Sequence, residues 1–116
     1  MTATPTALTK PHLEVHSLLV DLGFLVADEF KVGRYTLDMY IKEVHLGFEF
    51  DGPLHEMPKQ QRHDKLRDYW LLHEAGIPIF RVDAALLKNK NQLKIDLLDF
   101  IETHSLTSEE RRSKWV

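Results

Sequence analysis

Apolar and polar residues alternate along the stretch from Tyr35 to Asp51, as is typical of half-buried β-strands. The alternating apolar positions form two runs, Leu37, Met39 and Ile41, then Leu46, Phe48 and Phe50. Because successive side chains of a strand point to opposite faces, each run has one apolar face and one face that carries acid. A tight turn at about Lys42-Glu43 would join them, so the pattern predicts a β-hairpin.

Helical periodicity appears on both sides of this hairpin. Before it, Thr9 can cap a helix that Pro11 enters and Gly23 ends. The predicted apolar stripe of this helix is Val15, Leu18, Leu19 and Leu22. After the hairpin, a long helix is predicted from Pro58 to about Ala75. Its predicted buried stripe is Leu66, Tyr69, Trp70 and His73.

Two further strands and a last helix complete the pattern. The segment Phe24 to Phe30 reads as an edge strand, and Ile77 to Val82 reads as a buried strand that returns parallel after the long helix. Asp83 can cap a further helical segment, which Asn89 to Asn91 interrupts before a final one. The predicted order is αβββαβα. This order predicts an α/β fold with a mixed four-stranded sheet, an antiparallel meander plus one parallel strand, flanked by helices.

Composition is consistent with a single globular domain over residues 1–116. The chain is 43% hydrophobic and 28% charged. Residues 1–9 are predicted to be a loose N-terminal arm and residues 105–116 a polar, basic C-terminal tail. The sequence has no apolar run of about 20 residues and no secretory start, so we expect a cytoplasmic protein without a membrane span.

Charge argues only weakly against nucleic acid as a partner. The net charge is −3, whereas DNA-binding proteins are usually basic. Positive residues nevertheless cluster after the hairpin, and acid gathered at a metal site would lower the net value without removing a basic rim. The candidate nucleic-acid-binding residues in this cluster are Lys59, Arg62, Lys65 and Arg67.

Three acidic residues of the hairpin, Asp38, Glu49 and Asp51, are predicted to share one face. A two-residue turn would place Asp38 diagonal to Glu49, and a four-residue turn would place the two directly opposite, within roughly 5 to 8 Å in either case. Three crowded carboxylates repel one another unless a cation neutralises them. Carboxylate oxygens suit Mg²⁺ or Mn²⁺, so the pattern favours metal-assisted attack of water on a phosphodiester.

The order of these acids along the chain resembles that of the PD-(D/E)XK nuclease superfamily, and specifically that of its very-short-patch-repair-like endonuclease branch. That branch has a helix-borne Glu, a strand Asp, an E-x-D-G-x-x-H block, and a helix with a D-x-x-R pattern that ends in Gly before an apolar strand. The corresponding positions are Glu14, Asp38, Glu49 to His55, Asp64 with Arg67, and Gly76 to Val82. The resemblance spans Pro11 to Asp83.

The resemblance implies a Mg²⁺-dependent endodeoxyribonuclease with a restriction-endonuclease-like core. The metal ligands would be Asp38, Glu49 and Asp51, and Glu14 would orient water. The usual superfamily lysine, two residues after the Glu, is replaced by Asp51, so His55 becomes the candidate ligand or general base. Because the chain has no Cys, a thiolate zinc site like that of mismatch-repair members is excluded, and mismatch specificity is not carried over.

Several residues keep an alternative interpretation. Glu14 can be a solvated acid in the first turn of its helix. His55 can be an exposed loop residue. Asp64, Arg67 and Asp68 can be an ordinary set of surface ion pairs, or Arg67 can contact a phosphate while Asp64 holds His55 or a water.

Two main functional hypotheses arise from the sequence, with a less favoured third, a metal-dependent hydrolase of RNA or another phosphoester. The first is a metal-dependent DNA endonuclease that nicks DNA or cleaves selected structures such as junctions or repair intermediates. The second is a catalytically inactive nucleic-acid-binding or assembly module of the same fold, which the missing lysine and the acidic net charge favour. A homodimer or a larger nuclease assembly would be needed to cut both strands, since one site cuts one strand.

Overall fold

A four-stranded sheet forms the centre of the protein in the computed structural model, which describes residues 8–51 and 58–105, with the side chains of residues 58–61 left out. The elements are α1 (Lys10–Asp21), β1 (Ala27–Val32), β2 (Tyr35–Ile41), β3 (Leu46–Phe50), α2 (Pro58–His73), β4 (Ile79–Val82), α3 (Ala84–Leu87) and α4 (Lys90–Thr103). The strand order is β1-β2-β3-β4, with β1, β2 and β3 antiparallel and β4 parallel to β3. The predicted mixed sheet is therefore confirmed.

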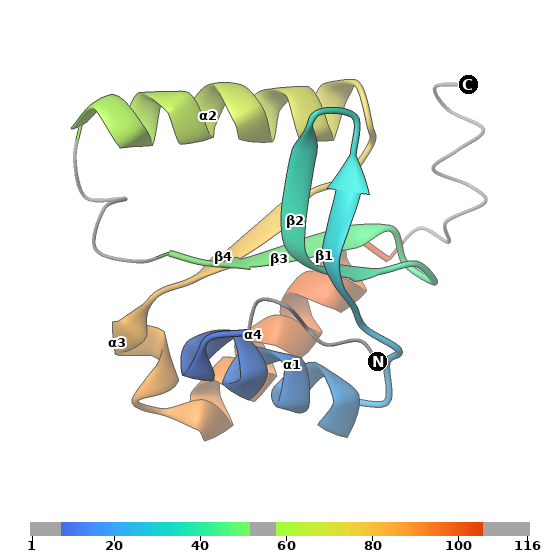
Figure 1. Cartoon of the computed structure of the whole chain (residues 1–116). Helices are drawn as coiled ribbons and strands as arrows, with labels where there is room; N and C mark the ends of the chain where they lie inside the picture. Colours follow the sequence, from blue (N-terminus) through green and yellow to red (C-terminus); the bar gives the residue numbers. More distant parts are fainter. Residues whose placement is uncertain (1–7, 52–57, 106–116) are drawn as a thin grey trace, which may run out of the picture.

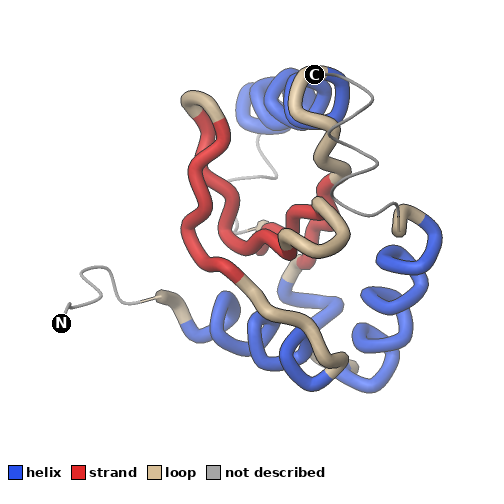
Figure 2. Tube along the Cα trace, turned by 90° about the vertical axis from the view of Figure 1, so that its right-hand side faces the viewer, coloured by secondary structure: helices blue, strands red, loops and turns tan. Residues whose placement is uncertain are grey.

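Helices cover both faces of this sheet (Figure 1). Helix α2 lies on one side, and α1 and α4 lie on the other, with the sheet between them (Figure 2). Each side has its own apolar core. The core on the α1 and α4 side is Val15, Leu18, Leu19, Met39, Ile41, Leu46, Phe48, Val82, Leu93, Leu97 and Ile101. The core under α2 is Leu37, Tyr40, Leu71, Ala75 and Ile77.

The start of α1 agrees with its sequence signals. The Thr9 hydroxyl accepts a hydrogen bond from the His12 backbone amide, and Pro11 occupies the first turn. Gly23 follows the helix with a φ of 98°, a conformation that glycine adopts without a side-chain clash. Of the predicted apolar stripe, Val15, Leu18 and Leu19 are buried and Leu22 packs against them in part.

The hairpin register agrees with the longer of the two predicted turns. Met39 pairs with Phe48 and Ile41 pairs with Leu46, so residues 42–45 form a four-residue connection. The two-residue turn at Lys42-Glu43 is wrong. Extending the observed register by one residue places Asp38 opposite Glu49, which is the arrangement expected for a four-residue turn.

Strand β2 does not keep a single apolar face. Leu37 lies in the core under α2, whereas Met39 and Ile41 lie in the core on the α1 and α4 side. The pairing of β2 with β1 is interrupted at Glu29, which has a φ of 51°, so the strand pair is irregular at this level. The prediction that all three residues share one face is wrong for this reason.

Helix α2 presents the opposite face to the sheet from the one predicted. Leu66 and Tyr69 are 66% and 64% exposed and His73 is exposed, while Trp70 is partly buried against the β1–β2 hairpin. The inward-facing positions include Arg67 and Asp68, whose side chains are only 11% and 32% exposed, together with the fully buried Leu71. The sheet offers charged partners to this face, so polar residues are buried and apolar ones are left outside.

Smaller differences concern element ends. Strand β1 begins at Ala27, three residues later than predicted, although it does lie at the sheet edge. Asp83 caps the short helix α3 and Asn89 caps α4, which confirms the predicted interruption.

Most of the predicted arm and tail, residues 1–7 and 106–116, lies outside the described residues. Within the described ranges, no helix combines the length and apolarity needed to cross a membrane.

Candidate active site

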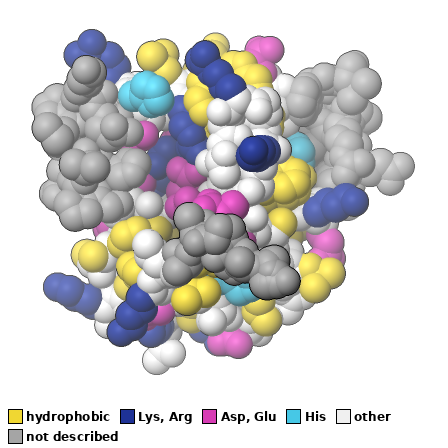
Figure 3. All heavy atoms as spheres, in the orientation of Figure 1, with side chains coloured by type: hydrophobic (Ala, Val, Ile, Leu, Met, Phe, Trp, Pro, Cys, Tyr) yellow, Lys and Arg dark blue, Asp and Glu magenta, His cyan; other side chains and the backbone are white. Residues whose placement is uncertain are grey.

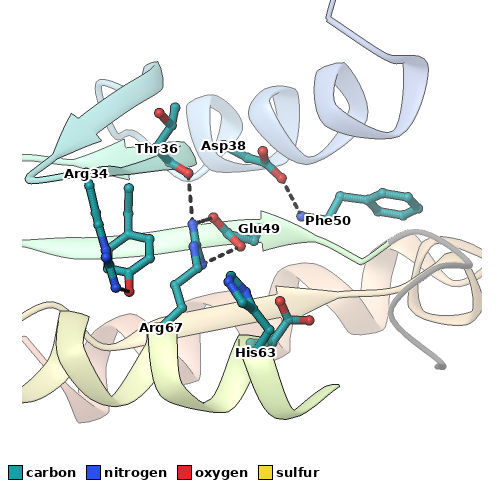
Figure 4. Close-up of a pocket in the computed structure, with 9 residues that line it drawn as sticks. Arg34, Thr36, Asp38, Glu49, Phe50, His63 and Arg67 are labelled. Atoms are coloured by element: carbon teal, nitrogen blue, oxygen red, sulfur yellow. Dashed lines mark hydrogen bonds and ion pairs between the residues drawn. The ribbon is translucent and has the colours of Figure 1, made fainter. Parts of the chain in front are cut away.

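An open pocket of about 350 Å³ lies between the β1–β2–β3 meander and α2. Its lining residues are Arg34, Tyr35, Thr36, Asp38, Glu49, Phe50, His63, Asp64 and Arg67. The close-up in Figure 4 shows Asp38 and Glu49 projecting from adjacent strands and His63 and Arg67 projecting from α2. Acidic and basic side chains lie next to each other in the band below α2 (Figure 3). Two of the three predicted acids, Asp38 and Glu49, therefore reach one pocket.

The Asp38 side chain is held in place by the neighbouring strand. Its Oδ2 accepts a hydrogen bond of 2.9 Å from the Phe50 backbone amide, which lies one residue beyond Glu49. No hydrogen bond within the described part of the chain engages its Oδ1. The backbone amide thus fixes the carboxylate while leaving an oxygen for a ligand in the pocket.

Glu49 is engaged by an arginine from α2. Arg67 donates through Nη1 to Glu49 Oε1 at 2.9 Å and through Nη2 to Glu49 Oε2, which makes a two-pronged ion pair. The Nη2 group also donates to the Thr36 carbonyl at 2.8 Å. The Arg67 and Glu49 side chains are 11% and 9% exposed. Arg67, predicted to belong to a surface ion-pair set with Asp64 and Asp68 or to contact a phosphate, instead forms a largely buried contact between α2 and the sheet.

A second arginine, Arg81 on β4, neutralises the remaining acids. It donates to Asp51 Oδ1 at 2.7 Å, and to both Asp68 oxygens at 2.9 and 2.6 Å. Its Nη1 also lies 3.5 Å from Glu49 Oε1. Burial lowers the pKa of Arg81, but the hydrogen bonds that Arg81 donates to Asp68 and Asp51, together with their negative charges, outweigh burial and raise it overall. Asp51 thus lies beside Arg81 and is not among the residues that line the pocket.

The environment of Glu49 changes its acidity. Burial raises the pKa of Glu49 above its usual value, and the charge of Asp38 acts in the same direction, whereas Arg67 and Arg81 lower it. Compared with the unfolded chain, the folded chain therefore binds more protons at Glu49 over a pH window. This window begins near the ordinary pKa of 4.5 and ends at the raised pKa.

This shift predicts a pH dependence of stability. The contribution of Glu49 is fully present below that window and is lost as the pH rises through the raised pKa, because the folded state binds more protons there. Glu49→Gln removes the titrating group. We expect the free energy of unfolding of the wild type to fall relative to that of the variant across this window, as measured by urea unfolding at several pH values. A difference that stays constant with pH would contradict this prediction.

The chemistry of Asp38 and Glu49 fits a hard divalent cation. Mg²⁺ is commonly bound by one or two carboxylates, with water and substrate phosphate completing the shell. A cation between the two side chains would offset the repulsion that contributes to the raised pKa of Glu49. Across the described residues, no group of three or more His, Asp or Glu side chains is arranged to hold a metal ion. The fit therefore rests on two protein ligands, and it requires Arg67 to release an oxygen of Glu49.

Besides Asp51, the predicted site residue Glu14 does not line this pocket. Glu14 on α1 forms an ion pair with Lys90 of α4, and this hydrogen bond lowers the pKa of Glu14. Helix α1 covers the face of the sheet opposite α2, so the predicted water-orienting role is not supported (Figure 1). His55 lies outside the described residues.

The four predicted nucleic-acid-binding residues have different positions. Arg62 and Lys65 are exposed on α2. Arg67 lines the pocket as the partner of Glu49 and is largely buried. The side chain of Lys59 lies outside the described residues.

Sequence reasoning missed Arg34, His63 and Arg81. His63 precedes Asp64 on α2 and lines the pocket beside the two acids. Arg34 lies at the tip of the β1–β2 hairpin, where its Nη2 donates to the Tyr35 hydroxyl at 3.1 Å and its guanidinium lies 5.2 Å from the centre of the Tyr35 ring. A signal was available for Arg81, which lies in the strand predicted to be parallel. The parallel register of β4 pairs Arg81 with Glu49.

Comparison with known proteins defines the fold class. No protein-family model and no curated protein sequence matches the chain. Among solved structures, the catalytic domain of the homing endonuclease I-Bth0305I is similar, with a TM-score of 0.67 and 19% sequence identity. The similarity covers 84% of this chain and 98% of that domain. The protein therefore has a restriction-endonuclease-like α/β fold, shared with the catalytic domain of a homing endonuclease.

Proposed function

We propose that the protein is a metal-dependent DNA endonuclease that hydrolyses phosphodiester bonds. One observation carries the proposal: Asp38 and Glu49 lie on adjacent strands and line one open pocket together with His63 and two arginines. The fold that holds this pocket is shared with a homing endonuclease catalytic domain, which supports the same chemistry. The proposed very-short-patch-repair-like relationship rests on the order of the acidic residues and His55 along the sequence.

Each pocket residue has a role in this proposal. Asp38 and Glu49 would hold Mg²⁺ or Mn²⁺, which would supply a Lewis acid for the phosphate and lower the pKa of an attacking water. His63 would accept the proton from that water, because a histidine side chain can act as a general base and His63 lines the same pocket as both acids. Asp51 acts indirectly, through Arg81, on the position of Glu49. His55 remains a second candidate base.

The test is incubation of supercoiled plasmid and branched DNA with Mg²⁺, Mn²⁺ or EDTA. A single pocket is expected to nick one strand, so the nicked circle should appear before linear DNA. A panel of duplex, flapped, junction and single-stranded substrates then distinguishes repair-type or junction selectivity from general nicking. Absence of cleavage with either metal on every substrate would reject the endonuclease.

A second candidate is a nucleic-acid-binding or assembly module without catalysis. It is favoured by the ion pair that occupies both oxygens of Glu49 with Arg67. Binding of DNA in EDTA, combined with no Mn²⁺ uptake in a calorimetric titration, would support this candidate. Mn²⁺ uptake that is lost in Asp38→Asn would exclude it.

Arg34 is expected to bind a phosphate of the DNA strand. It is exposed at the pocket mouth, whereas Arg67 and Arg81 are held by carboxylates. Its contacts with Tyr35 orient the guanidinium but use a single donor of the five that Arg carries. A charge-assisted hydrogen bond is typically worth about 1.5–3 kcal/mol. Arg34→Ala should therefore weaken DNA binding by about tenfold or more while kcat changes little.

The matched control is Lys88→Ala, which removes one exposed positive charge from the end of α3, away from the pocket. Arg34→Ala should also reduce the salt dependence of duplex binding by about one phosphate contact, and Lys88→Ala should not. Equal effects of the two substitutions would show that Arg34 contributes only general charge.

A further inference from the structure

The outer face of α2 is apolar and faces solvent. Leu66 and Tyr69 are 66% and 64% exposed, more than most apolar side chains of the protein, and the flanking Leu72 is 46% exposed. We call Arg62, Lys65, Leu66, Tyr69 and His73 the outer stripe of α2. Arg62, Leu66, Tyr69 and His73 are spaced three to four residues apart and Lys65 adjoins Leu66, which places all five on one side of the helix, opposite the buried Leu71. Exposed apolar groups gathered on one helix indicate an interaction surface.

Two aromatic rings of the outer stripe contact each other in a tilted arrangement. The ring centres of Tyr69 and His73 are 4.1 Å apart, with an angle of 39° between the planes. Tyr69 is nevertheless 64% exposed, so the other side of its ring is open to a further planar group. Preformed aromatic surfaces of this kind accept nucleic-acid bases by stacking.

The charge of the outer stripe is positive. Arg62 and Lys65 are exposed beside the two rings, and among its described positions the stripe contains no carboxylate. This absence is informative in a chain with 18 acidic residues and a net charge of −3. In Figure 3, basic and apolar side chains lie along the upper rim of the molecule, over α2, with an acidic side chain towards the right-hand end of this rim. A surface that combines exposed rings with positive charge is complementary to a polyanion with accessible bases.

We propose that the outer stripe of α2 binds an unpaired DNA strand, with a base stacked on Tyr69 and phosphates bound by Arg62 and Lys65. Bases of an intact duplex are stacked on each other and cannot reach a ring on a convex helix, so the stripe selects DNA that contains a single-stranded segment. The inference rests on the proposed function and specifies its substrate class as flapped, branched or single-stranded DNA.

The position of the outer stripe relative to the pocket supports this assignment. His63, Asp64 and Arg67 line the pocket and belong to the same helix. An α-helix with its side chains is about 10–12 Å across. A strand that lies along the outer stripe can therefore pass around α2 into the pocket within a few nucleotides.

The first experiment measures fluorescence anisotropy of a labelled single-stranded oligonucleotide and of the same sequence as a blunt duplex, both in EDTA. Tyr69→Ala should weaken single-strand binding by about tenfold, the effect expected for one stacked base, and change duplex binding little. Tyr69→Phe keeps the ring and should bind like the wild type. Leu25→Ala is the matched control, since Leu25 is 82% exposed outside α2.

Salt dependence separates stacking from charge. Lys65→Ala should reduce the slope of log affinity against log salt for the single strand by about 0.7, the value for one phosphate contact. Tyr69→Ala should lower the affinity and leave this slope unchanged. A Tyr69→Ala variant that binds the single strand as tightly as the wild type, or that loses duplex binding equally, would overturn the proposal.

Three combined outcomes distinguish the binding surface from a dimer contact and from the endonuclease itself. A concentration-dependent dimer in sedimentation velocity that Tyr69→Ala dissociates would make the stripe a contact between two copies of the chain, and would also overturn the proposal. Single-strand binding through Tyr69 without cleavage of any substrate rejects the endonuclease and leaves the binding surface standing. Cleavage with unchanged binding in Tyr69→Ala rejects the binding surface alone.

Discussion

Asp38→Asn is expected to lower the rate of plasmid nicking by about a thousandfold or more and to leave the fold intact. In the proposed mechanism, Asp38 supplies a charged ligand to the cation that stabilises the transition state, and such stabilisation amounts to several kcal/mol. The Asn side chain keeps a carbonyl oxygen that can accept the hydrogen bond from the Phe50 amide. The melting temperature should therefore change by no more than about 5 °C.

This substitution separates catalysis from stability better than one at Glu49. Glu49 is the two-pronged partner of the largely buried Arg67, so Glu49→Ala would leave the guanidinium under α2 without its main ion-pair partner. The control for Asp38→Asn is Glu43→Gln, which removes one exposed carboxylate from the turn between β2 and β3. Nicking by Asp38→Asn at the wild-type rate would remove Asp38 from the mechanism.

The sheet could be predicted from the sequence because each strand carries its own local signal. The alternation in the hairpin and the apolar run before Val82 are period-two and buried-strand patterns that depend on few neighbours. The register needed one more fact, the length of the turn, and residues 42–45 form the longer alternative. Because side chains alternate with period two, that length decides whether Asp38 lies opposite Glu49 or diagonal to it.

The orientation of α2 could not be predicted from periodicity, because its apolar face is the exposed one. A rule that buries apolar stripes selects Leu66 and Tyr69, and both are largely exposed. Arg67 and Asp68 are directed inward because Glu49 on β3 and Arg81 on β4 offer them partners of opposite charge. Those partners lie 13 to 18 positions away in sequence. Local patterns carry no information on such pairs.

The same limitation explains why the arginines at the site were missed. Crowded carboxylates were expected to need a cation, and the described structure provides two guanidinium groups, from Arg67 and Arg81. Arg81 stands within the apolar run of β4, where it reads as an interruption of a buried strand. Its role appears only once the parallel pairing of β4 with β3 places it beside Glu49.

Arg81→Met is expected to lower the free energy of unfolding by about 3 kcal/mol, with a fall in melting temperature of roughly 10 °C. The substitution keeps a long side chain but leaves Asp51 and Asp68 without the guanidinium that binds both. Breaking a buried ion pair typically costs about 3–5 kcal/mol. The lower end applies because these two side chains are 25% and 32% exposed, so water solvates them in part. Thermal unfolding followed by circular dichroism gives the measurement.

A triple variant tests whether charge is the cause. If the loss comes from removing the positive charge that Arg81 places between these carboxylates, then Arg81→Met combined with Asp51→Asn and Asp68→Asn should recover most of the stability, because replacing a whole buried ion-pair set is often close to neutral. A triple variant as unstable as Arg81→Met would instead show that Arg81 stabilises the protein through packing. An unchanged melting temperature in Arg81→Met would show that the network between β3, β4 and α2 contributes little. In that case the inward orientation of the charged face of α2 would need another physical cause.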